Sequence, residues 1–168
     1  MNCYLGAIQA AQALRNSEDI WRTRSGKERK AFAELCLNIS DILDQIHITL
    51  RRHRNPDLLL RQLDRYAKRL PELCPHLKDP DPVILSKKLV ARQPAGELYR
   101  LYSHNRICRK LPKLYAKAAD EFELLSDDID LLDYYTRNFF NSSALPGKQS
   151  AASDHTPAFG MRPQSRLP

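Results

Sequence analysis

The longest uninterrupted helical pattern in the chain is PKLYAKAADEFELLSDDIDLLDYYTRNFF, residues 112–140. Its apolar side chains recur at spacings of three, four and seven residues, at Leu114, Ala118, Phe122, Leu125, Ile129, Leu132 and Phe139. This spacing is typical of an α-helix with a single buried face. At about 1.5 Å per residue the helix would be roughly 40 Å long, which is enough to form the backbone of a helical bundle.

A second long helix is predicted at residues 27–54. Bulky apolar side chains follow the same spacing of three and four residues there, at Phe32, Leu35, Ile39, Ile42, Ile46 and Leu50. Its β-branched isoleucines lower the intrinsic helix propensity, so this helix should depend on burial in a core. Because the two helices are similar in length and each has one apolar face, we expect them to pack against each other.

Shorter helices are expected before and between the two long ones. Residues 2–14 are rich in alanine and leucine, which favours a short helix. Residues 55–57 and residues 81–82 each place a proline after a capping side chain, so a helix should begin at each site. Pro71 should stop or kink the first of these helices, and residues 97–110 should form another.

These elements predict an all-α fold, a four- to six-helix bundle formed by residues 1–141. The chain has 168 residues, which is enough to bury a stable core without disulfides. Residues 142–168 are rich in proline and small polar residues and have no periodic apolar face. We expect them to form a disordered, flexible C-terminal tail.

The cysteines and the apolar content bear on the compartment. The four cysteines are far apart and form no C-x-x-C pair, so we expect reduced thiols in a cytoplasmic protein. No apolar run approaches the roughly 18 residues of a membrane span, so no membrane partner is expected. The chain also lacks the common phosphate-binding glycine loops and metal-binding histidine pairs, and we expect no cofactor.

Charge is distributed unevenly along this chain, whose net charge is +7. Residues 51–113 contain sixteen basic and six acidic side chains, whereas residues 114–140 contain two basic and seven acidic ones. Another basic cluster follows Trp21, the only tryptophan, and we interpret it as a solvated helix start. Its members are Arg22, Arg24, Lys27, Arg29 and Lys30.

The basic segment supports a nucleic-acid-binding hypothesis. If its side chains converge on one surface, they would make the phosphate contacts that dominate nucleic-acid affinity, and Tyr66, Tyr99 and Tyr102 could stack on bases. No recognition helix, RNA-binding motif or zinc finger accompanies them. The candidate residues are Arg51, Arg52, Arg54, Arg61, Arg65, Lys68, Arg69, Lys87, Lys88, Arg106, Arg109 and Lys110.

The acidic segment supports a third hypothesis, metal-dependent hydrolysis. Glu123, Asp127 and Asp130 share one flank of the predicted helix, and Asp41 and Asp44 form a second acidic pair. The arrangement resembles the facing acid pairs with which helical nucleotide pyrophosphohydrolases bind magnesium. The favoured interpretation is a solvated flank that offsets the charge of the basic segment.

Among these hypotheses, the leading one is a non-enzymatic module for protein–protein interaction or regulation. It follows from a complete helical pattern without a catalytic constellation. Its partner would be another protein of unknown identity, and both a homo-oligomer and a nucleic-acid complex remain open as alternatives.

Overall fold

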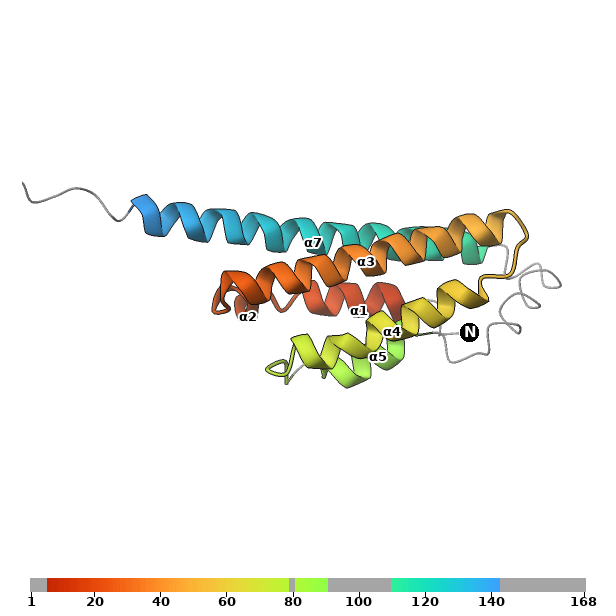
Figure 1. The fold of residues 1–168 in the computed structure, drawn as a ribbon, viewed down its shortest axis with the longest axis horizontal. Helices are drawn as coiled ribbons and strands as arrows, with labels where there is room; N and C mark the ends of the chain where they lie inside the picture. Colours follow the sequence, from red (N-terminus) through yellow and green to blue (C-terminus); the bar gives the residue numbers. More distant parts are fainter. Residues whose placement is uncertain (1–5, 79–80, 91–109, 143–168) are drawn as a thin grey trace, which may run out of the picture.

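The computed structural model describes residues 6–78, 81–90 and 110–142. The described residues contain six helices and no strand (Figure 1): α1 (Gly6–Arg15), α2 (Glu18–Arg22), α3 (Gly26–Arg51), α4 (Asp57–Leu73), α5 (Pro82–Leu89) and α7 (Leu111–Ser142). The prediction of an all-α fold with two long helices is confirmed. The helix predicted at 97–110 and the tail predicted beyond Ser142 lie outside the described residues.

The two long helices, α3 and α7, lie side by side along their length and form the main interface of the bundle (Figure 1). The large apolar residues of both predicted stripes meet in this interface. Phe32, Ile39 and Ile46 of α3 and Phe122 of α7 are fully excluded from solvent. The expected packing of these helices against each other is therefore confirmed.

Small side chains set the register of this interface. Among the described residues, three contacts between a side chain of one helix and a main-chain carbonyl of the other cross it: the Ser126 hydroxyl donates to Ala33 (2.9 Å), the Ser40 hydroxyl donates to Ala119 (2.9 Å), and His47 Nδ1 lies 2.7 Å from the Pro112 oxygen. Successive contacts advance by seven residues on α3 and retreat by seven on α7. The helices are therefore antiparallel with a heptad register.

A fourth heptad position continues the interface at the start of α3. Gly26 precedes Ala33 by seven residues, and a Cβ atom built on Gly26 would lie 3.0 Å from the Asp133 carboxylate. Residues without large side chains thus recur at Gly26, Ala33 and Ser40 along α3. Because small residues let two helices approach closely, hydroxyl groups can reach the backbone of the neighbouring helix.

The shorter helices cover the remaining core. α4 packs on α3, α5 packs on α4, and α1 contacts both α5 and α7. Leu14, Leu63 and Leu85 bring the apolar faces of α1, α4 and α5 into the same buried cluster. The start of α1 lies directly on the end of α5, since a Cβ atom on Gly6 would come within 2.4 Å of the Lys88 carbonyl oxygen.

The end of α3 differs from its predicted position. The helix ends at Arg51, three residues early, because His53 adopts a left-handed conformation with φ of 51°. The His53 and Arg54 amides then donate to the Leu50 and Thr49 carbonyls, at 2.9 and 3.0 Å. This is a Schellman turn, which satisfies carbonyls that the last helical turn leaves without partners.

Pro71 was expected to stop or kink α4, and the structure excludes a stop there, because the helix continues to Leu73. Because proline has no backbone N–H, the helix lacks one hydrogen bond, and this missing bond falls in its last turn. The Cys74 amide still donates to the Leu70 carbonyl, at 2.9 Å.

At α5 the cap is as expected: the Asp81 carboxylate accepts from the Val83 amide, at 2.8 Å, and Pro82 is the first residue of the helix.

We predict that Ala119→Leu destabilises the protein. Ala119 is buried in the α3–α7 interface, and extra side-chain volume in a packed core costs about 1–3 kcal/mol. Urea unfolding should show a midpoint shift of that size. Lys117→Leu, which adds the same side chain at an exposed position of the same helix, should leave the midpoint nearly unchanged. Equal effects of the two substitutions would contradict the close approach of α3 and α7.

Candidate functional site

The basic residues that were named as nucleic-acid-binding candidates, where the structure describes them, lie on separate parts of the surface. Arg51, Arg52, Arg54 and Lys110 are exposed at the end of the bundle where α3 ends and α7 begins (Figure 1). Lys87 and Lys88 are exposed in the last turn of α5. Arg106 and Arg109 lie outside the described residues.

Four further basic candidates lie on α4, where they face in two directions. Lys68 forms an ion pair with Asp64 (2.6 Å) and lines a cavity between α4 and α5 together with Lys87. Arg65 and Arg69 instead line a cavity between α3 and α4. Arg61 is exposed one helical turn before Arg65.

The acidic candidates face solvent. Glu123, Asp127 and Asp130 are all exposed on the outer side of α7. Within residues 6–78, 81–90 and 110–142, no three histidine, cysteine or acidic side chains are grouped so that they could hold a metal ion. Two other acids of α7 face neighbouring helices instead: Asp128 forms an ion pair with Arg15 of α1, and Asp133, which follows the acidic flank by three residues, forms one with Arg29 of α3.

An apolar groove lies between α1–α2 and the second half of α7. Its cavity volume is about 710 Å³, and we call it the Trp21 groove. Its apolar lining comes from Trp21, Leu125, Ile129, Leu131, Leu132 and Tyr135. Arg15 and Arg22 lie on its α1–α2 side, and in Figure 1 α7 continues past α2.

One stripe of α7 leaves large apolar side chains in solvent beside this groove. Leu124, Leu131 and Tyr135 are 45, 53 and 58% exposed, and their spacings of seven and four residues place them on one face of the helix. The acidic flank with Asp127 and Asp130 follows next around the helix. A contiguous apolar surface with polar borders is typical of a site for a macromolecular partner.

The floor of the groove is rigid. Trp21 is 2% exposed, and its ring stacks on Phe32 of α3 with ring centroids 3.9 Å apart and planes inclined by 14°. Its buried indole N–H has no acceptor in the described part of the chain. Since buried tryptophan N–H groups usually find a partner, this donor is a further unusual feature of the groove.

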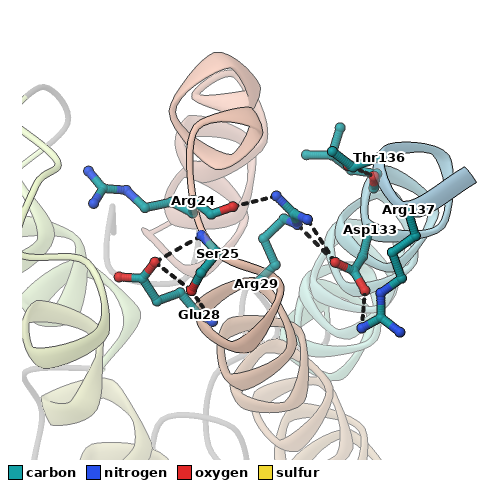
Figure 2. A network of polar contacts seen from close by, with 8 residues as sticks. Arg24, Ser25, Glu28, Arg29, Asp133, Thr136 and Arg137 are labelled. Atoms are coloured by element: carbon teal, nitrogen blue, oxygen red, sulfur yellow. Dashed lines mark hydrogen bonds and ion pairs between the residues drawn. The ribbon is translucent and has the colours of Figure 1, made fainter. Parts of the chain in front are cut away.

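A buried ion pair fixes α7 beside the groove, as Figure 2 shows. The Arg29 guanidinium donates through Nε (3.2 Å) and Nη2 (2.8 Å) to one oxygen of Asp133, and through Nη1 to the Arg24 carbonyl. Arg137 binds the other Asp133 oxygen at 2.7 Å. Because the Arg29 side chain is only 5% exposed, the expectation that it belongs to a solvated cluster is wrong: its charge is paired across the interface.

The start of α3 is fixed by a capping box, also drawn in Figure 2. The Ser25 hydroxyl accepts from the Glu28 amide, and the Glu28 carboxylate accepts from the Ser25 amide at 3.0 Å. The hydrogen bond from the Ser25 backbone lowers the pKa of Glu28 below its usual value of 4.5. The contribution of this carboxylate to stability is therefore present at neutral pH, and it is lost as the pH falls below 4.5 towards the lowered pKa.

The two described cysteines are buried and free. Burial raises the pKa of Cys36 well above its usual range and that of Cys74 to about 12. Both thiols are therefore protonated at neutral pH, and a protonated thiol is a poor nucleophile. This finding agrees with the expectation of reduced, structural cysteines for these two residues.

The residues of the Trp21 groove were not predicted as a site. The available indication was the position of Leu124, Leu131 and Tyr135, which share a face that is distinct from the predicted buried stripe. Trp21 reaches the groove because the short helix α2 lies between α1 and α3, and no local sequence pattern indicates this placement.

Comparisons with known proteins give no functional assignment. No family model, no curated protein and no solved structure matches this chain. Among the helices of the described residues, none is both long enough and apolar enough to cross a membrane.

We predict that Asp133→Ala lowers the free energy of unfolding by about 3–5 kcal/mol, because it leaves the Arg29 charge buried without its partner. The matched control is Asp128→Ala, which removes the half-exposed ion pair with Arg15 and should cost at most about 1 kcal/mol. Replacing both Arg29 and Asp133 with apolar residues should recover most of the loss. Equal losses for the two single variants, measured by urea unfolding, would show that the Arg29–Asp133 pair does not fix α7.

Proposed function

We propose that this protein is a non-enzymatic interaction module that binds another protein through the Trp21 groove. The observation that carries the proposal is the exposed apolar stripe of α7 beside a groove with a rigid, stacked floor. Tyrosine and tryptophan are enriched among the residues that contribute most of the binding energy at protein interfaces.

The proposed occupant is an amphipathic helix of the partner protein. From Leu125 to Thr136 the groove follows α7 for about three helical turns, roughly 16 Å. A helix docked along it would present apolar side chains at spacings of three, four and seven residues, the pattern of helix-in-groove recognition. The partner's apolar face would cover Leu131 and Tyr135 and exclude water from the groove.

The charges along the two borders support a particular orientation of this helix. Arg15 and Arg22 lie on the α1–α2 border, where Arg15 is paired with Asp128 of α7, whereas Asp127 and Asp130 follow the exposed stripe on the other side. A partner helix with acidic residues on one flank and basic residues on the other would complement both borders. Such complementarity contributes chiefly to specificity and to the association rate.

We predict that a displayed library of amphipathic helical peptides yields ligands for this groove, with acidic and basic residues on opposite flanks. The sole tryptophan lies in the groove floor, so its fluorescence should change when a selected peptide binds. Leu131→Asp should weaken binding by about tenfold or more, since it places a charge in the centre of the apolar contact.

The matched control is Leu37→Asp, because Leu37 of α3 is exposed to a similar extent, 46%, and does not line the groove. It should leave peptide affinity unchanged. The proposal fails if the library yields no ligand, or if the Leu37 and Leu131 variants lose affinity equally. If the selected peptides carried no charge on either flank, the groove would still be a docking site, but the proposed orientation of the partner helix would be wrong.

A further inference from the structure

A second, polar groove lies between α3 and α4, and it is distinct from the Trp21 groove. Its cavity volume is about 570 Å³, within the range of about 300–1,000 Å³ that small-molecule sites occupy. Side chains of both helices line it, among them Asp41, Gln45, Gln62, Arg65, Tyr66 and Arg69. We call it the Tyr66 groove.

Positive charge is concentrated on the α4 side of this groove. Arg65 and Arg69 are one helical turn apart and exposed, and Arg61 continues the row by one further turn. Lys68 is neutralised by Asp64, whereas neither Arg65 nor Arg69 has an ion pair within the described residues. Like charges at this spacing repel each other. A bound phosphate would relieve that repulsion, and two guanidinium groups suit its oxygens.

An aromatic ring lies between the two arginines in the chain. Tyr66 is half-buried, packs against the hydrophobic core and also lines the groove. Its ring is therefore held by the core while part of it faces the cavity. Nucleic-acid bases stack on aromatic rings in such sites, because every base has a planar π face.

Polar groups from both helices can contact the edge of a base. Gln45 of α3 and Gln62 of α4 each offer an amide donor and an amide acceptor, and Asp41 of α3 offers a carboxylate that accepts hydrogen bonds. A carboxylate repels phosphate but favours a base with N–H donors, such as guanine. The groove thus combines two arginines, an aromatic ring and several hydrogen-bonding groups.

We propose that the Tyr66 groove binds a nucleoside phosphate, with the phosphate on Arg65 and Arg69 and the base against Tyr66. Asp41 accepts hydrogen bonds from the N–H groups of the base. The ligand is either a free nucleotide or one nucleotide unit of a single-stranded nucleic acid, since both present this chemistry. This proposal is independent of protein docking in the Trp21 groove.

The test measures binding of guanosine monophosphate and of a short fluorescent guanosine-rich oligonucleotide to the full chain at low salt. Arg65→Gln combined with Arg69→Gln should weaken binding of the preferred probe by about tenfold or more and reduce its salt dependence. Tyr66→Leu should also weaken binding, while Tyr66→Phe, which keeps the ring, should not. Asp41→Ala should reduce the preference for guanosine over uridine monophosphate.

The matched control is Lys68→Gln, which removes a positive charge from the same helix but from the other groove. It should change affinity by less than about twofold. If the protein bound the oligonucleotide but not guanosine monophosphate, the ligand would be a single-stranded nucleic acid. If both probes bound with the same affinity per nucleotide unit, the ligand would be a free nucleotide. The proposal is overturned by no binding of either probe, by an equal loss in the Lys68 variant, or by equally tight binding of a polyglutamate peptide.

Discussion

The close antiparallel contact between α3 and α7 is the constraint on which the rest of the structure depends. Its heptad of small residues brings the two backbones near enough for Ser40 and Ser126 to donate across the interface. Because these two hydroxyls are hydrogen-bonded, the cost of removing them from water is offset, and large side chains such as Phe32 and Phe122 fill the adjacent layers. The Arg29–Asp133 pair then fixes the end of this interface.

This contact also determines what the other faces of the long helices present. On α7, the buried stripe and the α3 interface occupy one side, so Leu124, Leu131 and Tyr135 are directed away from the core. On α3, the face that does not meet α7 meets α4, and the polar Tyr66 groove lies along that boundary. A single pair of long helices thus supports an apolar groove on one boundary and a polar groove on another.

Much of the fold could be predicted from local patterns, because apolar periodicity and capping chemistry act over a few residues. Both long helices and the starts of α4 and α5 were predicted within about three residues, as expected for such boundaries. The burial of Arg29 could not be predicted, since its partner Asp133 is remote in the chain. The Trp21 groove was not predicted as a site. Of the Tyr66 groove, only Arg65, Tyr66 and Arg69 of α4 were named as nucleic-acid-binding candidates, because the lining of each groove combines residues from separate helices. The small residues at Gly26, Ala33 and Ser40 do recur every seven positions in the sequence, but apolar periodicity alone does not show that the two backbones approach closely there.

Residue-resolved hydrogen exchange tests whether the α3–α7 pair holds the structure together, because it reports which backbone amides open only when the whole protein unfolds. The slowest amides should lie in α3 and in the facing part of α7, around Phe32–Leu50 and Tyr115–Ile129. They should exchange with a common free energy of opening equal to that of global unfolding. If the α7 amides opened independently, with a much lower free energy than those of α3, the antiparallel pair would not be the unit that holds the structure together.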